Sequence, residues 1–413
     1  MELESIDRAL LAGSFGKAAA LAMDILVRYG RVCGAGRFVS ITAAHIDACL
    51  YHGQSSIDFA RRFVELEGRV RVPTTLNVGA VDVVHPEWHC GAPELLGHQR
   101  ELNGLYARLG CLPTLTCAPY QRRARPSAGE HIAWAESNAI VFANSVLGAR
   151  TDRYGDFTDL CAALTGRVPL TGLHCEANRQ PTRVFKAPEI AATGLPRDLY
   201  FAAMGYVLGR LSAGEVPLIR DLPADSTEDE LKALGAAGAS SGSLALFHAA
   251  GITPEATAAL SHAVKLNLCE IAISESALCE AIERLCPIAV GETVAAVCLG
   301  TPHYSIEEFR KLSHSLEGRK LPFAVEIYVS TSREIAATLK IGADFSALRS
   351  SGVKIVVDTC TYVAPVVRGT GAILTTSAKF AHYAPGNLQR RTGLMTLERC
   401  LLSAELGKVA PPC

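Results

Sequence analysis

Three cysteines of the chain stand in polar, turn-rich segments rather than on apolar helical faces. Cys117 lies in TLTCAPY, Cys360 lies in DTCTY, and Cys298 lies just before GTPH. Iron–sulfur clusters and iron centres are held by thiolates that converge from separate loops, and three protein ligands leave a position open for a substrate. Spacing alone leaves two interpretations open, an iron site or three loop cysteines that bind nothing.

A dense set of polar side chains follows the first of these cysteines, within residues 129–153. Asn144 and Ser145 interrupt an apolar run there, and Arg150 and Arg153 follow the glycine at its end. Two guanidinium groups beside a turn suit the recognition of a carboxylate. A solvated polar helix face is the alternative interpretation.

A second polar segment, TTSAKFAHY at 375–383, follows an apolar run near the C-terminus. Its hydroxyls, the ammonium of Lys379 and the imidazole of His382 stand where a strand is expected to end. These groups suit anion binding or proton transfer. Capping of loop backbone is the alternative.

Three other motifs do not predict the sites that they suggest. GSFGK at 13–17 lacks the spacing and the hydroxyl residue of a phosphate loop. The G-x-S-x-G pattern at 238–242 has a predicted helix before it and a strand after it, the reverse of a nucleophile elbow. HPEWHC at 85–90 suggests zinc, but the chain has no C-x-x-C pair to complete such a site.

The composition is that of a globular protein. Forty Lys and Arg against 41 Asp and Glu give a net charge of −1, which argues against a general nucleic-acid or anionic-membrane binder. No run of about 18 apolar residues is present, and the acidic N-terminus is unlike a signal peptide. We therefore expect a cytoplasmic protein whose 14 cysteines are free thiols or metal ligands.

The chemistry-bearing segments must be positioned by α/β elements. Apolar spacing predicts helices over 6–29, 42–52 and 133–147, and a strand, a loop and a strand over 69–84. Strands and helices alternate over 293–358, which predicts a parallel sheet covered by helices on both faces. Ligands bind beyond the carboxyl ends of such strands, where GTPH and DTC are expected.

One predicted helix carries a start signal. Ser305 is followed three residues later by Glu308, which is the pattern of a capping box. The expected organisation is a helical segment 1–65, a first α/β lobe 66–215 that includes Cys117, and a second α/β lobe 216–413 that includes Cys298, Cys360 and the 375–383 segment.

Several segments resemble sequences of the aconitase X family, in order and over nearly the whole chain. They are TTLNVG, TCAPY, GEHIAWAESN, ANSVLGART, TGR, GTPHYS, DTC and SAKFAHY. The resemblance implies aconitase-like catalytic α/β lobes with parallel sheets flanked by helices. It also implies a hydro-lyase that uses an iron centre bound through cysteines as a Lewis acid.

The resemblance favours dehydration of cis-3-hydroxy-L-proline to Δ1-pyrroline-2-carboxylate. Dehydration of a phosphorylated hydroxy acid such as mevalonate 5-phosphate is the alternative, and a regulatory iron-binding subunit is the alternative without catalysis. RNA binding by such a subunit is disfavoured by the near-zero net charge. The swivelling β-rich domain of aconitases is expected to be absent from this chain and supplied by a separate small subunit, together with the catalytic base.

Roles for individual residues follow from the same resemblance. Cys117 and Cys360 match the family motifs as iron ligands, and Cys298 is a third candidate because Thr301 stands where many relatives have cysteine. A [2Fe-2S] cluster is favoured and mononuclear iron stays open. The catalytic candidates are His303, Lys379 and His382. The substrate-binding candidates are Asn77, Asn138, Ser145, Arg150 and Arg153.

Overall fold

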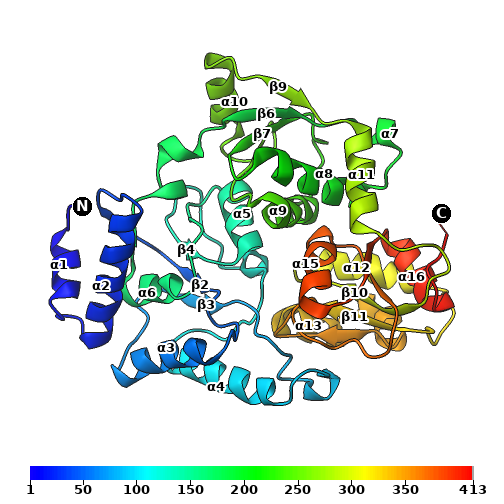
Figure 1. The fold of residues 1–413 in the computed structure, drawn as a ribbon, viewed down its shortest axis with the longest axis horizontal. Helices are drawn as coiled ribbons and strands as arrows, with labels where there is room; N and C mark the ends of the chain where they lie inside the picture. The colour runs from blue at the N-terminus through cyan, green and yellow to red at the C-terminus, as the bar shows by residue number, and fades with distance from the viewer. Residues whose placement is uncertain (412–413) are drawn as a thin grey trace.

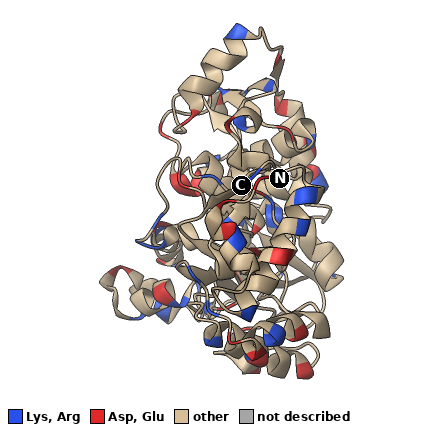
Figure 2. Ribbon diagram, turned by 90° about the vertical axis from the view of Figure 1, so that its left-hand side faces the viewer, with Lys and Arg blue, Asp and Glu red and all other residues tan. Residues whose placement is uncertain are grey.

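A computed structural model describes residues 1–411 and shows three α/β units, each built around its own parallel sheet (Figure 1). The N-terminal unit contains strands β1 to β5, the middle unit β6 to β9, and the C-terminal unit β10 to β14. Within residues 1–411, no helix combines the length and the apolar character needed to cross a membrane. Basic and acidic residues are intermixed along the ribbon in Figure 2, as the balanced composition suggests.

The N-terminal unit has a three-stranded parallel sheet in the order β3-β2-β4 and a separate antiparallel pair, β1 with β5. Apolar side chains of its helices and strands form one buried cluster. The strands are β1 (Phe38–Ser40), β2 (Ala44–Ile46), β3 (Thr74–Leu76), β4 (Ala133–Trp134) and β5 (Arg167–Pro169). The helices are α1 (Ser5–Leu11), α2 (Lys17–Val32), α3 (Gln54–Glu65), α4 (Glu94–Arg108), α5 (Ser137–Ser145) and α6 (Thr158–Thr165).

The middle unit has a four-stranded parallel sheet in the order β8-β7-β6-β9. Its strands are β6 (Arg183–Lys186), β7 (Pro217–Arg220), β8 (His248–Ala249) and β9 (Glu270–Ala272). Its helices are α7 (Ile190–Thr193), α8 (Arg197–Ser212), α9 (Glu228–Gly242), α10 (Ala256–Lys265) and α11 (Glu275–Leu285).

The G-x-S-x-G pattern forms the last turn of α9, and its glycines serve packing. A Cβ at Gly242 would overlap the backbone of Gly209 in α8, and a Cβ at Gly209 would overlap that of Gly238. Glycine therefore allows these two helices to approach backbone to backbone. Because the G-x-S-x-G pattern lies inside a helix, it does not form a nucleophile elbow, as predicted.

The C-terminal unit has a five-stranded parallel sheet in the order β12-β11-β10-β13-β14. Its strands are β10 (Val294–Leu299), β11 (Glu326–Ser330), β12 (Lys354–Val356), β13 (Ala372–Thr375) and β14 (Thr392–Leu394). Its helices are α12 (Ile306–Leu316), α13 (Arg333–Ile341), α14 (Ser346–Ser350), α15 (Ala378–Leu388) and α16 (Leu397–Leu406). The predicted parallel α/β class is confirmed.

The predicted capping box at the start of α12 is confirmed. The backbone N–H of Glu308 donates to Ser305 Oγ at 3.1 Å, and the backbone N–H of Ser305 donates to Glu308 Oε2 at 2.7 Å. Two otherwise unpaired helix N–H groups are thereby satisfied. The helix then places Phe309, Leu312 and Leu316 in the core of the C-terminal unit.

The three helix predictions in the N-terminal half differ from the structure. The single helix predicted over 6–29 is two helices, α1 and α2, with a break at 12–16. Residues 42–52 contain the short central strand β2 rather than a helix, and all three of its residues are buried. A strand covered on both faces shows no polar alternation, so a short one cannot be told from a helix by periodicity. The predicted helix over 133–147 is strand β4 followed by α5, with Glu136 as the N-cap between them.

The predicted boundaries between lobes also differ from the sheets. A boundary after residue 65 would separate β2 from β3, which pair in one sheet. A boundary after residue 215 would separate β6 from β7, which also pair. Strands that pair although they are far apart in sequence cannot be recognised from composition. Because β2 pairs with β3, segment 1–65 is part of the larger N-terminal unit.

Candidate active site

Polar side chains gather where the carboxyl ends of two sheets face each other. In the N-terminal unit, Asp47, Asn77 and Glu136 follow the neighbouring parallel strands β2, β3 and β4. In the C-terminal unit, the segments after β10, β12 and β13 carry His303, Cys360 and Lys379 in the same way. Side chains distant in sequence meet here because parallel strands end at one common edge.

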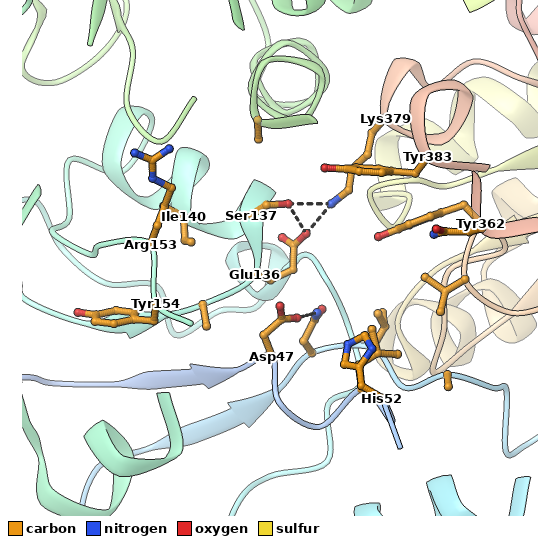
Figure 3. A pocket seen from close by; sticks show the side chains of 18 of the residues that line it. Asp47, His52, Glu136, Ser137, Ile140, Arg153, Tyr154, Tyr362, Lys379 and Tyr383 are labelled. Carbon is orange, nitrogen blue, oxygen red and sulfur yellow. Dashed lines mark hydrogen bonds and ion pairs between the residues drawn. The ribbon is translucent and has the colours of Figure 1, made fainter. Parts of the chain in front are cut away.

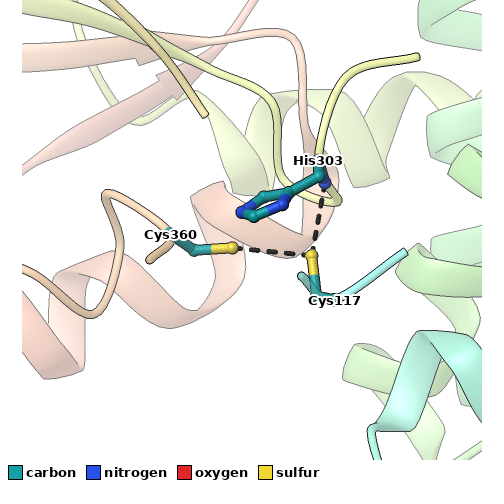
Figure 4. Close-up of side chains that lie close together, drawn as sticks. All are labelled: Cys117, His303 and Cys360. Atoms are coloured by element: carbon teal, nitrogen blue, oxygen red, sulfur yellow. Dashed lines mark hydrogen bonds between the residues drawn. The ribbon is translucent and has the colours of Figure 1, made fainter. Parts of the chain in front are cut away.

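Two cysteines from different units lie next to each other (Figure 4). The Sγ atoms of Cys117 and Cys360 are 3.6 Å apart although 243 residues separate them in sequence. His303 completes a buried group whose potential ligand atoms all lie within 4.8 Å of one another. It is the one such group of at least three His, Cys, Asp or Glu side chains found in residues 1–411.

The His303 side chain holds the two cysteine loops together. Its Nε2–H donates to the carbonyl of Thr359 at 3.1 Å, and its Nδ1 accepts from the hydroxyl of Thr116 at 2.9 Å. These threonines immediately precede the two cysteines. The backbone N–H of His303 also donates to Cys117 Sγ at 3.3 Å. Burial lowers the pKa of His303 to about 4, so the ring is neutral at pH 7.

The loop that carries His303 depends on a glycine. Gly300 has φ +82°, and a Cβ there would overlap the backbone carbonyl of Ser330 at the end of β11. Glycine at this point therefore lets the loop pass directly over the neighbouring strand.

We expect Gly300→Ala to destabilise the protein and disturb the cysteine group. The left-handed backbone costs an alanine about 1–2 kcal/mol, and the overlap adds about 1–3 kcal/mol. Gly291→Ala is the matched control, because Gly291 has φ +84° and open space around it. Thermal unfolding should show a clearly larger loss for Gly300→Ala, and equal losses would contradict the role of the overlap.

A cavity of about 740 Å³ lies beside the cysteine group (Figure 3). All three units contribute to its lining, for example Arg153, Ser243 and Lys379. Val78 and Tyr362 line the cavity and also belong to the packed cluster that contains both cysteines. These two residues therefore connect the cavity wall to the cysteine group.

A buried ion pair crosses the cavity from one unit to another. Lys379 Nζ lies 2.5 Å from Glu136 Oε1 and 3.2 Å from Ser137 Oγ, to which it donates. Lys379 is 3% exposed and Glu136 is 4% exposed. Burial acts to lower the pKa of Lys379, but the Glu136 carboxylate outweighs it and holds that pKa well above its usual value. Lys379 is therefore charged at pH 7.

Asp47 is the second acid of the cavity. Its carboxylate accepts a hydrogen bond from Asn77 Nδ2, a pairing that follows from the register in which Ile46 lies opposite Leu76. Burial raises the pKa of Asp47 to about 7, and the nearby Glu136 carboxylate adds to the effect.

Three predicted site residues line the cavity, namely Asn77, Arg153 and Lys379. Asn138 lies behind the wall, where its Nδ2 donates to the carbonyl of Cys117 at 2.8 Å and its Oδ1 accepts from the hydroxyl of Tyr120 at 2.5 Å. Asn138 therefore supports the cysteine loop.

The structure does not bring the other predicted residues into the lining. Ser145 accepts from the backbone N–H of Phe247 at 2.9 Å. Arg150 pairs with Glu176. His382 lies on α15 with Nδ1 3.4 Å from the hydroxyl of Tyr206.

Cys298 also lies apart from the cysteine group. It is fully buried in β10, within an apolar cluster that includes Tyr328 and Phe380. Its side chain points into the core because its place in the strand fixes the face on which it lies.

Sequence analysis missed several residues of the lining. Glu136, Ser137, Tyr362 and Tyr383 stand in segments that it had singled out, but it did not choose them. Asp47 was overlooked because its segment was interpreted as a helix. A strand assignment for β2 would have placed Asp47 at a strand end, where ligand-binding residues are expected.

Comparison with known proteins identifies the family of the chain. The models of the aconitase X first, second and third domains match residues 1–177, 181–283 and 294–405. Cis-3-hydroxy-L-proline dehydratase of Pseudomonas aeruginosa is 39% identical over 98% of this chain and 70% of its own length. The phosphomevalonate dehydratase large subunit of Methanosarcina mazei is 34% identical over 99% of this chain and 98% of its own length.

A solved structure supports the same assignment. The crystal structure of Thermococcus kodakaraensis aconitase X in its holo-form matches with a TM-score of 0.87 and 31% identity, over 98% of this chain and 100% of that one. The predicted resemblance and the predicted hydro-lyase class are confirmed. The chain belongs to the aconitase X family and is a dehydratase.

Proposed function

We propose that the protein dehydrates cis-3-hydroxy-L-proline to Δ1-pyrroline-2-carboxylate. The observation that carries the proposal is the buried group of Cys117, Cys360 and His303 at the wall of a polar cavity. Two relatives named cis-3-hydroxy-L-proline dehydratase are 39% and 38% identical to the chain. Those named phosphomevalonate dehydratase large subunit are 34% identical or less.

The residues of the cysteine group fit an iron centre. Two soft sulfur donors lie side by side in a buried position, and Thr301 nearby has a buried hydroxyl without a hydrogen-bond partner. We propose that Cys117 and Cys360 hold the iron, as a [2Fe-2S] cluster or as mononuclear iron. Such a centre supplies Lewis acidity toward a leaving hydroxyl group when it is bound. Cys298 is not included, because it packs in the apolar core.

The chain's own residues bind the substrate and set the geometry. Arg153 and Lys379 place positive charge on the cavity wall, which suits a carboxylate. Glu136 orients Lys379 through their ion pair. His303 joins the two cysteine loops through its hydrogen bonds to Thr116 and Thr359. Its ring is neutral at pH 7, so we assign it a positioning role.

A second chain completes the enzyme in this proposal. The chain spans only 70% and 68% of the two hydroxyproline dehydratases, whereas it spans 94–98% of the relatives named large subunits. We propose a small subunit that brings the base for removal of the C–H proton.

Two further points belong to the proposal. The match to phosphomevalonate dehydratase large subunits over nearly their whole length makes a phosphorylated hydroxy acid the second candidate substrate.

We place the protein in the cytoplasm, because the cysteines within residues 1–411 are free thiols, as a reducing compartment favours.

The proposed function is tested by expressing the chain with and without a small subunit of the aconitase X type, under anaerobic conditions. We expect turnover of cis-3-hydroxy-L-proline only when both chains are present. Efficient turnover by this chain alone would refute the role of a small subunit. Turnover of mevalonate 5-phosphate but not of hydroxyproline would overturn the substrate assignment.

A further inference from the structure

Two groups of opposite charge on the cavity wall have no ionic partner among the residues that the structure describes. Glu136 and Lys379 neutralise each other, but Arg153 and Asp47 form no ion pair within residues 1–411. Arg153 Nη1 donates only to the carbonyl of Ser243, at 2.5 Å. Figure 3 shows Arg153 and Asp47 on different sides of the space that Glu136 borders. A ligand that carries both a carboxylate and a cation would complement this pair.

The amide oxygen of Asn77, beside Asp47, also lacks a hydrogen-bond partner. Asn77 is 3% exposed, and while its Nδ2 donates to Asp47, its Oδ1 is buried without any hydrogen bond. A buried acceptor without a donor costs about 1–3 kcal/mol. Asn77 lines the cavity, so a donor on a bound ligand would satisfy it.

A cation on the ligand would also stabilise the ionised form of Asp47. The charged groups that raise its pKa are the acids Glu136, Asp156 and Asp159, and burial contributes most. The cavity cations Lys379 and Arg153 are engaged elsewhere, by Glu136 and by the Ser243 carbonyl. A positively charged donor from the ligand would therefore stabilise the carboxylate.

The ring nitrogen of a proline derivative has the required chemistry, because it is a secondary ammonium with one positive charge and two N–H donors. We propose that Asp47 and Asn77 form the subsite for this ammonium, with one N–H directed to the Asp47 carboxylate and the other to Asn77 Oδ1. Arg153 then takes the carboxylate of the same molecule. This inference rests on the proposed function and adds the atoms that recognise the amine.

The same subsite excludes the second candidate substrate. A phosphorylated hydroxy acid brings a carboxylate and a phosphate but no ammonium, so it leaves Asn77 Oδ1 without a donor and places negative charge near Asp47. Like charges at short range and an unsatisfied acceptor both oppose binding.

The test compares two probes that differ in one group, L-proline and cyclopentanecarboxylate. Both have a five-membered ring and a carboxylate, but only L-proline has the ammonium. We expect the iron-loaded wild-type complex to bind L-proline more tightly in calorimetry. Asp47→Asn should weaken L-proline binding about 10–100-fold, the range of a charge-assisted hydrogen bond. It should change cyclopentanecarboxylate binding less than about threefold. Asp221→Asn is the matched control, because Asp221 forms a surface pair with Lys186, and it should leave the affinity for both probes within about threefold.

A second readout follows the proton of Asp47. With a pKa raised to about 7, Asp47 is partly protonated near neutral pH. An ammonium favours the ionised form, so L-proline binding should release protons, seen as a dependence of the binding heat on buffer ionisation. Asp47→Asn should abolish the release.

The outcomes separate this inference from the proposed function. Equal affinity of the wild type for both probes, or an unchanged affinity of Asp47→Asn for L-proline, would overturn the ammonium subsite even if hydroxyproline is turned over. Failure of the wild type to bind L-proline and to turn over hydroxyproline would overturn both.

Discussion

Replacing Cys360 with serine is expected to remove the bound iron and to lower dehydratase activity by at least about 1000-fold. A Lewis acid contributes several kcal/mol to expulsion of a poor leaving group, and about 4 kcal/mol corresponds to 1000-fold in rate. Cys117→Ser should have the same effect, because the two Sγ atoms are adjacent and belong to one group. Iron content, visible absorption and turnover of anaerobically purified protein measure these changes.

Cys298→Ser is the matched control for both variants. Cys298 is as deeply buried as the other two cysteines, but it lies in the apolar cluster of the C-terminal core, with the Thr361 side chain as a polar neighbour. The control should keep its iron, whatever it loses in thermal stability. Full iron occupancy in Cys117→Ser and Cys360→Ser would reject these residues as ligands, and loss of iron in Cys298→Ser alone would restore the third cysteine to the site.

Lys379→Met is expected to cost both stability and activity. Removal of one partner from a buried ion pair leaves the other charge uncompensated, which costs about 3–5 kcal/mol. Here Glu136, which is 4% exposed, would be left without its cationic partner. Loss of a charge directed at the substrate costs about 100-fold or more in turnover. Urea unfolding and steady-state kinetics measure the two effects.

The double variant Lys379→Met with Glu136→Gln separates the two effects. It removes both charges, so it should regain much of the lost stability but none of the lost activity. Lys186→Met provides the exposed control, because Lys186 and Asp221 form a surface pair 3.8 Å apart, and such pairs contribute about 0–1 kcal/mol. A Lys379→Met variant as stable as Lys186→Met would contradict the buried pair.

The C-terminal unit could be predicted in detail because its elements carry strong local signals. The six residues of β10 form a continuous apolar run, and α12 begins with a capping box that the structure contains. The motifs around Cys117 and Cys360 also identified the two cysteines that the structure brings together. Local sequence determines the strand and the helix start directly, whereas the two cysteines were indicated by the resemblance to a family.

The N-terminal sheet and the finer parts of the site could not be predicted in this way. Its strands have two or three residues each, too few to show a period. The location of Cys298 depends on which face of β10 it occupies, and the part played by His303 depends on Thr116 and Thr359, which are far from it in sequence. Such contacts depend on how segments far apart in sequence pack together, which cannot be read from a single sequence.

The two sulfurs belong to different units, and this has a consequence for the whole chain. A metal that takes ligands from two units contributes part of its binding free energy to their association. With iron held as proposed, substitutions that loosen the junction between units, far from any sulfur, would weaken iron binding without altering a ligand. The metal content of a purified sample would then report on the integrity of the whole chain as well as on its cysteines.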